Sequence, residues 1–311
     1  MRIIYMGTPD FAVPALQHLY EKGYQISLVV TQPDKPRDRG KKIQPTPVKV
    51  LAEDLGISVM QPNQIKENDD FLDHIAALNP DLIVVVAYGK MLPNRLLSIP
   101  RFGCVNIHGS LLPKYRGAAP IQHAILAGDE RTGVTLMYMS EGMDKGDIIA
   151  TDSTTIGDKT AGELHEELAV MGADLLVGTL PFIEAGTAMR IKQDDTLASY
   201  APMIKKQDGL VDFNRTPEEI RRQIRAMNPW PGAYTYYKGK PLKLFEAKDG
   251  SESNPEGLLP GTIVFSKTEG IGVQTGKGIL LVTRIQMPGK RIIDVSEFLK
   301  GNQIEIYQVL G

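Results

Sequence analysis

The chain has 311 residues, more than most single compact cores hold, so we expect two domains. Hydrophobic residues make up 42%, charged residues 23%, and the formal net charge is −2, which excludes a disordered chain and a strong overall attraction to nucleic acid. A single cysteine excludes an internal disulfide and a multi-cysteine metal site, and with neither a leader pattern nor an apolar run near ~20 residues we expect a cytoplasmic protein that is not inserted in a membrane.

The first half of the chain alternates short apolar runs with helical patterns. Gly7 closes the first run, and Thr8 and Pro9 are typical of a helix N-cap and first turn. The unbroken apolar run 81–88 indicates a central parallel strand that is buried on both faces. This rhythm predicts a Rossmann-like, mostly parallel α/β sheet. Its strands are expected at 2–6, 26–31, 58–60, 81–88, 102–108, 134–139 and 148–155.

A basic, proline-rich segment separates the second strand from the next helix. It runs over 32–45 without apolar periodicity, until Thr46 and Pro47 provide a helix start. Helix–strand connections in such sheets usually have about 2 to 6 residues, and longer ones are often functional. We therefore expect an exposed basic loop whose length favours function; the alternative is a solvated connector.

The second half of the chain has a different sequence pattern. A capping box at Thr160 and Glu163 opens a long helix that we expect to close a first domain, 1–192. The polar stretch 193–208 indicates a linker, and a second domain follows over 209–311. After a helix, short alternating segments separated by glycine turns predict a small, OB-like antiparallel β-barrel. These segments are 233–237, 242–247, 262–265, 271–275 and 279–285.

The charge is divided unevenly between the two halves. From Lys205 onward there are 16 Lys and Arg residues against 12 Asp and Glu residues, net +4, and the preceding residues have a net charge of −6. The second half is therefore the better candidate to face a polyanion. The cations of the helix that opens it, Arg221, Arg222 and Arg225, are nevertheless more typical of a solvated helix face than of an RNA contact.

Polar side chains gather where the strand 102–108 ends. Asn106 and His108 are separated by one residue, so their side chains point to the same face. Ligands of open α/β sheets bind outside the carboxyl ends of the strands, so these two residues and the end of the neighbouring strand should face one crevice. A carboxamide and an imidazole could both donate to a tetrahedral oxyanion, and one such donor contributes about 3 to 4 kcal/mol. The pattern predicts acyl-type transfer.

The histidine needs a partner that holds its ring. Asp144 or Asp147, in a glycine-flanked loop, is the expected partner, and a buried carboxylate could also accept a proton from an attacking amine. No nucleophile of the protein is required, because Ser110 lacks the nucleophile-elbow pattern and Cys104 lies in mid-strand beside a core. Direct transfer between two bound substrates fits best.

The stretch 106–121, Asn-Ile-His-Gly-Ser-Leu-Leu-Pro-Lys-Tyr-Arg-Gly-Ala-Ala-Pro-Ile, resembles the methionyl-tRNA formyltransferase family. The resemblance extends along the chain, at 7–12, 31–34, 40–42, 84–89, 142–147 and 228–231. The Asn, His and Asp set with Ser-Leu-Leu-Pro is shared by enzymes that use formyltetrahydrofolate, so it specifies the reaction. The basic loop and the C-terminal barrel with Asn-Pro-Trp-Pro specify the acceptor.

The resemblance implies transfer of the formyl group of 10-formyltetrahydrofolate, a co-substrate, to the α-amine of methionine esterified to initiator tRNA. It implies that Asn106 and His108 are oxyanion donors and that Asp144 either tunes His108 or relays the proton. The folate pocket is expected to be lined by Ser110, Leu111, Leu112, Pro113, Tyr88 and Gly89. The expected tRNA contacts, besides the C-terminal domain, are Arg37, Arg39, Lys41 and Lys42, with Arg39 the most important. We expect no metal and a monomer.

Two other functions compete with this one. A formyltransferase for a small acceptor, such as glycinamide ribonucleotide or an amino-sugar nucleotide, would share the first domain but would not need the basic loop. A folate- or nucleotide-sensing module without turnover would keep the sheet but would not require His108 and Asp144.

Overall fold

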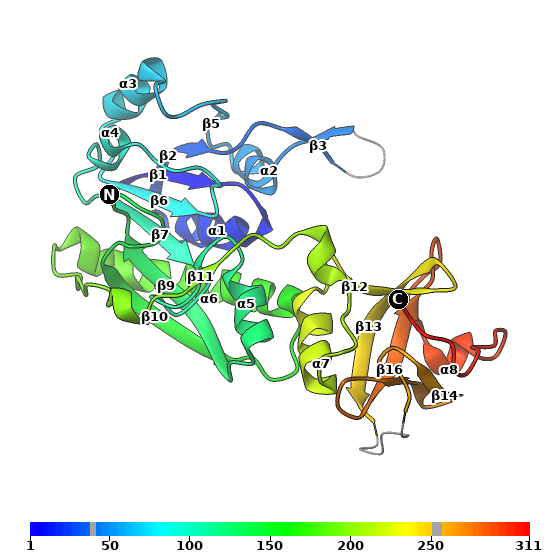
Figure 1. Cartoon of the computed structure of the whole chain (residues 1–311). Coiled ribbons are helices and arrows are strands. Elements are labelled where there is room, and N and C mark those ends of the chain that lie inside the picture. The colour runs from blue at the N-terminus through cyan, green and yellow to red at the C-terminus, as the bar shows by residue number, and fades with distance from the viewer. Residues whose placement is uncertain (38–41, 251–256) are drawn as a thin grey trace. The chain divides into compact units, whose positions relative to one another are not determined.

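The computed structural model describes residues 1–37, 42–250 and 257–311 (Figure 1). They form two compact units, each made of several segments of the chain. The first unit comprises Met1–Pro120, Arg131–Thr155 and His165–Ala201, and the second comprises Ile121–Glu130, Ile156–Leu164 and Pro202–Gly311. The last change of unit, after Ala201, falls inside the expected linker 193–208, and the second unit also takes in two short segments from within 1–192.

A seven-stranded sheet forms the centre of the first unit. Its strands are β1 (Arg2–Gly7), β2 (Gln25–Val30), β5 (Val59–Met60), β6 (Leu82–Val86), β7 (Cys104–His108), β9 (Arg131–Tyr138) and β10 (Ile148–Thr155). They lie in the order β10-β9-β7-β6-β1-β2-β5. The strands from β7 to β5 are parallel, and β9 and β10 add two antiparallel pairings. This confirms the predicted Rossmann-like, mostly parallel sheet.

Helices follow the strands as the sequence predicts. They are α1 (Val13–Glu21), α2 (Pro47–Asp54), α3 (Asp69–Ala77), α4 (Asn94–Leu97), α5 (Pro120–Ala127) and α6 (Ala161–Glu184). The caps at Thr46 and at Thr160 with Glu163 are confirmed. Thr8 is not a cap, because a 3-10 turn over Asp10–Ala12 precedes α1 and the Thr8 hydroxyl donates to the Tyr88 carbonyl, 3.1 Å away. None of the described helices is long and apolar enough to cross a membrane.

The central strands are buried on both faces. On one face, Ile4 and Ile83 pack in a core cluster with Phe71 of α3. On the other, Ile107 of β7 lies against α6 at Gly172, where a Cβ atom would come within 2.6 Å of the isoleucine side chain. An unbroken apolar strand therefore has a packing partner on each side, as its pattern predicts.

The basic segment 32–45 contains regular structure that the sequence did not reveal. Two short strands, β3 (Lys35–Arg37) and β4 (Lys42–Gln44), pair as an antiparallel hairpin. Asp34 anchors its base, because its carboxylate accepts from Lys49 Nζ and Gln61 Nε2, each at 2.6 Å. The bond from Lys49 holds the pKa of the Asp34 carboxyl below its usual value.

From Pro202 onward, the described residues of the second unit form an antiparallel sheet with α-helices on either side of it in the sequence. Its elements are α7 (Pro217–Ala226), β12 (Ala233–Tyr237), β13 (Lys240–Asp249), β14 (Ile263–Lys267), β15 (Gly270–Gln274), β16 (Ile279–Gln286), β17 (Ile293–Asp294) and α8 (Val295–Phe298). The strand order is β12-β13-β16-β15-β14, with β17 beside β16.

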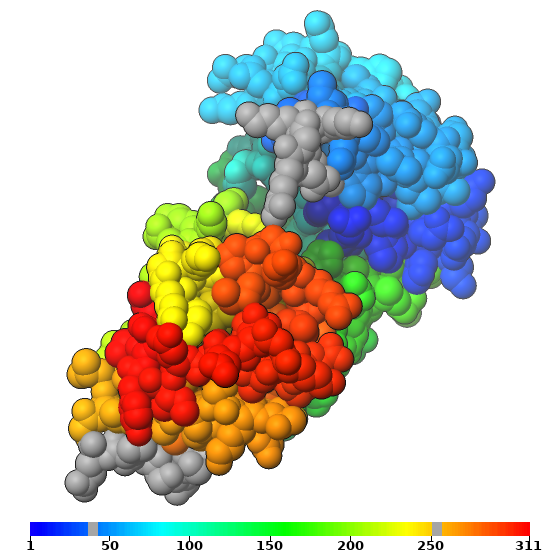
Figure 2. Space-filling view, turned by 90° about the vertical axis from the view of Figure 1, so that its right-hand side faces the viewer, coloured from blue at the N-terminus to red at the C-terminus, as the bar shows by residue number. Residues whose placement is uncertain are grey.

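The C-terminal segment links the two edges of this sheet. Tyr307 N–H donates to Ile263 O of β14 at 2.8 Å, and Gly311 N–H donates to Tyr236 O of β12 at 3.0 Å. Figure 2 shows these last residues, in red, against the yellow and orange strands. The chain end thus connects the first and last strands of the predicted small antiparallel barrel.

Candidate active site

One face of β7 carries the residues on which the predicted chemistry depends. Cys104 lies in the core cluster, where burial raises the pKa of its thiol to about 12. Asn106, two residues further, is half-buried, and its carboxamide has no hydrogen-bond partner within the described residues. His108 ends the strand. The Asn106 carboxamide, near the end of the strand, is therefore available to donate a hydrogen bond, and the Cys104 thiol is buried in the core.

The His108 ring is held by a backbone carbonyl. Its Nε2 lies 2.9 Å from Tyr115 O, and because a carbonyl only accepts, Nε2 carries the hydrogen. Its Nδ1 faces Asp144 Oδ2 at 3.7 Å, with the side chains 8% and 17% exposed. This distance is too long for a hydrogen bond but short enough for a strong electrostatic effect. Of the two carboxylates that the sequence offered, Asp144 is the one beside His108.

Both neighbours of His108 have a backbone conformation that is uncommon outside glycine. The φ angle is +61° at Tyr115 and +54° at Asp144. Such conformations cost energy, and they persist where surrounding contacts enforce them, often at functional sites. One enforcing contact is the Gly117 N–H, which donates to Asp144 Oδ2 at 2.8 Å. The position of the carboxylate is therefore imposed by its surroundings.

The loop that follows β7 is tied down from inside. Ser110 is fully buried, and its hydroxyl donates to Lys114 O at 2.7 Å. Thr135 of β9 donates to Ser110 O at 2.7 Å and accepts from Leu112 N–H at 3.1 Å. A ligand at this loop would therefore meet the half-buried Leu111 and Pro113 and the backbone, and not the serine hydroxyl.

The Tyr88 side chain points into the core and not toward the strand-end crevice. It is 1% exposed, burial raises the pKa of its hydroxyl to about 12, and that hydroxyl has no partner in the part of the chain that the structure describes. Its carbonyl accepts from Thr8 and Gln32. Gly89 has φ +87°, with open space where a Cβ would lie. This strand end can therefore offer backbone and space to a ligand.

Family models match both halves of the chain. The model described as formyl transferase matches residues 1–180, and the model described as formyl transferase, C-terminal domain, matches 203–303. The chain belongs to the formyl transferase family. Proteins named methionyl-tRNA formyltransferase from Desulforamulus reducens and Clostridioides difficile are both 47% identical to it; the alignments cover 100% of this chain and 98% and 100% of those proteins.

Solved structures share the fold at lower identity. HypX from Aquifex aeolicus, in complex with tetrahydrofolic acid, is 19% identical with a TM-score of 0.63, over 96% of this chain and 47% of that one. An N-formyltransferase from Helicobacter canadensis, in complex with folinic acid and dTDP-3-aminofucose, is 19% identical with a TM-score of 0.64, over 90% and 97%. The fold of this formyl transferase thus occurs in proteins whose sequences differ from it at about four of every five positions.

The structure gives only partial information about the expected tRNA contacts. Arg37 and Lys42 form the last Cα pair of the β3–β4 hairpin before its tip. Arg39 and Lys41 lie outside the described residues. The RNA-binding role of these four cations therefore stays a prediction.

The cations of α7, in contrast, already form ion pairs or hydrogen bonds within their own unit. Arg221 Nη1 lies 2.5 Å from Asp249 Oδ2, Arg222 pairs with Glu218, and Arg225 Nη1 donates to Gly157 O at 2.5 Å. These contacts favour the structural interpretation over an RNA contact.

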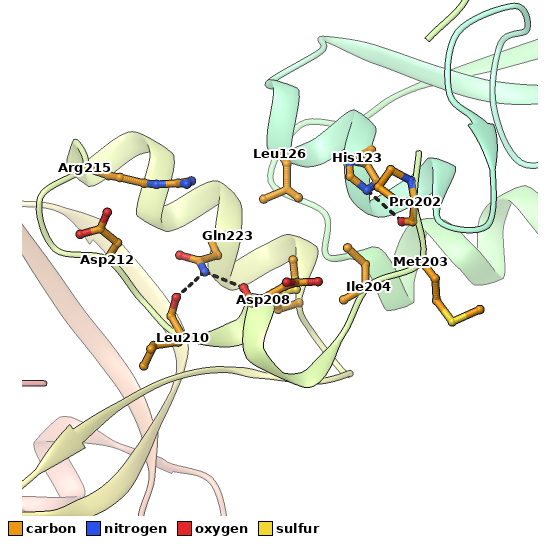
Figure 3. A pocket seen from close by; sticks show the side chains of 11 residues that line it. His123, Leu126, Pro202, Met203, Ile204, Asp208, Leu210, Asp212, Arg215 and Gln223 are labelled. Atoms are coloured by element: carbon orange, nitrogen blue, oxygen red, sulfur yellow. Dashed lines mark hydrogen bonds between the residues drawn. The ribbon is translucent and has the colours of Figure 1, made fainter. Parts of the chain in front are cut away.

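The second unit of the formyl transferase also contains a cavity of about 380 Å³ (Figure 3). None of the predicted site residues lines it. His123 Nε2 donates to Pro202 O at 3.1 Å and Gln223 Nε2 donates to Asp208 O at 2.8 Å, whereas the buried Gln223 Oε1 has no partner within the described residues. Among the described residues, no group of three His, Cys, Asp or Glu side chains is arranged to hold a metal ion.

Sequence reasoning missed the residues that hold the site. Thr135 lies inside an apolar strand pattern, and Gln193 lies in the stretch that we assigned to the linker. Gln193 Nε2 donates to the carbonyls of Asp144 and Gly146, both at 2.8 Å. Neither residue belongs to a recognisable motif, so no sequence signal could have identified them.

Proposed function

We propose that the protein transfers the formyl group of 10-formyltetrahydrofolate to the α-amino group of methionyl-initiator tRNA, giving N-formylmethionyl-tRNA for translation initiation. The observation that carries this proposal is the 47% identity, over the whole chain, to proteins named methionyl-tRNA formyltransferase. The convergence of Asn106, His108 and Asp144 at one strand end supports the same reaction.

The two donors act on the oxygen of the formyl group. During the reaction the amine nitrogen bonds to the formyl carbon, and that oxygen becomes negatively charged. The Asn106 carboxamide, which has no partner within the described residues, donates an N–H to it. His108 donates from Nδ1, because Tyr115 O holds Nε2. Fixed donors aimed at the developing charge need no reorganisation, which is why they lower the barrier.

Asp144 handles the proton. The amine loses one proton when it becomes an amide, and the folate nitrogen gains one when its bond to the formyl carbon breaks. The 3.7 Å gap between His108 Nδ1 and Asp144 Oδ2 places the carboxylate beside the reacting atoms without a direct bond to the ring, which favours it as the acceptor of the first proton. Tyr115 O, and not Asp144, orients the ring.

The substrates are placed by the rest of the chain. Leu111 and Pro113, with the backbone at Ser110, Leu112, Tyr88 and Gly89, line the folate site. The basic segment 32–45, through Arg37, Arg39, Lys41 and Lys42, and the C-terminal barrel contact the tRNA backbone, which makes binding salt-sensitive. The protein acts as a monomer in the cytoplasm, and sedimentation at working concentration with and without tRNA tests the monomer.

The deciding experiment supplies 10-formyltetrahydrofolate with methionyl-initiator tRNA, free methionine or an amino-sugar nucleotide, and measures the formylated product. We expect formylation of the charged tRNA, with free methionine and the amino-sugar nucleotide unmodified. Formylation of the small amines alone would overturn the acceptor. Binding of the folate without transfer to any acceptor would overturn the enzymatic function.

A further inference from the structure

Gln193 lies at the centre of a hydrogen-bond network beside the candidate active site. Its Nε2 donates to Asp144 O and Gly146 O, both at 2.8 Å, and its Oε1 accepts from Arg116 Nη2 at 2.8 Å and Nε at 3.1 Å. A guanidinium offers only donors and carbonyls only accept, so the carboxamide can be placed in one way. Its two N–H groups and both lone pairs are used.

The arginine in this network is itself held. Arg116 is 7% exposed, and its Nη1 lies 2.7 Å from Asp195 Oδ1. It belongs to β8 (Arg116–Gly117), which pairs with β11 (Tyr200–Ala201). Gly117, the next residue, donates its N–H to Asp144 Oδ2 at 2.8 Å. The same two-residue strand therefore fixes the Asp144 carboxylate directly and its backbone through Gln193.

Asp144 needs this support because of its backbone. With φ at +54°, it has a conformation that the chain would leave if its contacts were removed. The carbonyls that Gln193 binds, at positions 144 and 146, enclose the strained stretch. Gln193 reaches Asp144 through the main chain only, so its removal would change where the carboxylate lies and not what it is.

We infer that Gln193 is a positioning residue that places the Asp144 carboxylate relative to His108. The inference rests on the proposed function, in which Asp144 accepts the proton of the attacking amine. It predicts that Gln193 influences turnover through Asp144 alone. A misplacement of a reacting group by about 1 Å can cost up to ~100-fold in rate.

The first test is kinetic. Gln193→Ala is expected to lower kcat by roughly 10- to 100-fold, with the KM values for folate and tRNA within about 2-fold of wild type. Gln207→Ala, an exposed glutamine of the following stretch, is the matched control and is expected to behave as wild type. Wild-type kcat in Gln193→Ala would overturn the inference.

A double-mutant cycle separates positioning from a general structural role. If Gln193 acts through Asp144, the double variant Gln193→Ala with Asp144→Asn is expected to be no slower than Asp144→Asn alone. Multiplying rate losses would overturn the inference. If Asp144→Asn alone has normal turnover, or if the wild type transfers no formyl group, the proposed function fails instead, so the two failures are distinguishable.

Gln193→Glu keeps the test decisive if the alanine variant folds poorly. The glutamate retains the acceptor for Arg116 but has no N–H for the two carbonyls. It is expected to remain folded, because its ion pair with Arg116 offsets part of the two lost hydrogen bonds, and to lose at least as much kcat as Gln193→Ala. Full activity in Gln193→Glu would mean that the two donated hydrogen bonds do not place Asp144, and the inference would be wrong.

Discussion

The end of β7 and the arginines of α7 are both groups of polar side chains that the sequence marks as candidates for function, yet they differ in their hydrogen bonding within the fold. At the end of β7, the Asn106 carboxamide has no partner within the described residues, and His108 Nδ1 lies 3.7 Å from the nearest carboxylate oxygen in the site. On α7, the guanidinium groups of Arg221, Arg222 and Arg225 each bind a carboxylate or a carbonyl of their own unit, although the buried Nε of Arg225 has no hydrogen-bond partner among the described residues.

This difference teaches that residue type and charge are weaker indicators of function than free hydrogen-bonding capacity. A group that the fold has already satisfied must give up a contact before it can bind a substrate, and losing a buried contact costs about 1–3 kcal/mol. A group that the fold leaves unsatisfied can bind without that loss. Substitutions in these two regions, and in the basic segment 32–45, test this contrast.

The largest effect is expected at His108 and Asp144. His108→Ala and Asp144→Asn should each lower kcat by about 100-fold or more, because each removes a group that acts on the reacting atoms. Circular dichroism and the melting temperature should remain close to wild type. Near-normal turnover in either variant would mean that the catalytic set must be reassigned.

Asn106→Ala should lower kcat by about 100-fold through loss of one oxyanion donor. Because its carboxamide has no partner within the described residues, the free energy of unfolding should hardly change. Single-turnover kinetics with saturating substrates would measure the chemical step. A lower free energy of unfolding with unchanged turnover would show that Asn106 has a structural role, like the arginines of α7. The contrast between the two regions would then be wrong.

Much of the site could be predicted from the sequence because its signals are local. The spacing of Asn106 and His108 on a strand fixes a shared face, and an apolar run such as 81–88 fixes a central strand. The caps at Thr46 and Thr160 also act over three residues and are confirmed. Short-range patterns of this kind require no knowledge of distant packing.

The remainder depended on contacts between distant segments. Thr8 reads as an N-cap, but its hydroxyl bonds to Tyr88, 80 residues away. The Tyr115 carbonyl that orients His108 is a backbone atom, which every residue has. Gln193 acts from a stretch that resembles a linker. In each case the residue type fits several roles, and only the tertiary structure chooses among them.

The basic segment 32–45 is where the resemblance places the RNA contact, with Arg39 the most important residue. Arg39→Ala should lower kcat/KM for tRNA by roughly 10-fold and reduce the salt dependence of tRNA binding by about one phosphate contact, with folate binding unchanged. Steady-state kinetics over a salt series would measure both. An unchanged salt slope would argue against this segment as the RNA contact.

Removing a cation of α7 that is already bonded within its unit should lower the stability of the protein and leave its activity unchanged. Arg225 Nη1 donates to Gly157 O at 2.5 Å, so Arg225→Ala removes this hydrogen bond, and because water can replace it at the exposed carbonyl the unfolding free energy should fall by about 1 kcal/mol. Urea titration measures this, and Arg215→Ala, exposed near the start of the same helix, is the control with little expected change. A raised KM for tRNA at unchanged stability would make α7 an RNA surface.

The smallest effect on activity is expected at Cys104, two residues before Asn106 on the same face of β7. Burial raises the pKa of its thiol to about 12, compared with about 8.5 in an unfolded chain. The folded state therefore holds this proton more tightly, so the stability that the thiol contributes is complete below pH ~8.5 and is lost as the pH rises from there through the folded pKa.

At pH 8 the thiolate fraction of Cys104 should be roughly 10³-fold lower in the folded protein than in urea. Alkylation by iodoacetamide, followed by mass spectrometry, should be slow for the native chain and fast for the unfolded one, and Cys104→Ala provides the blank. Formyl transfer should survive exposure of the native protein to the reagent. Rapid labelling of the native protein with loss of turnover would instead show that the reagent reaches Cys104 in the folded state. The accessible part of the β7 face would then extend from His108 to Cys104.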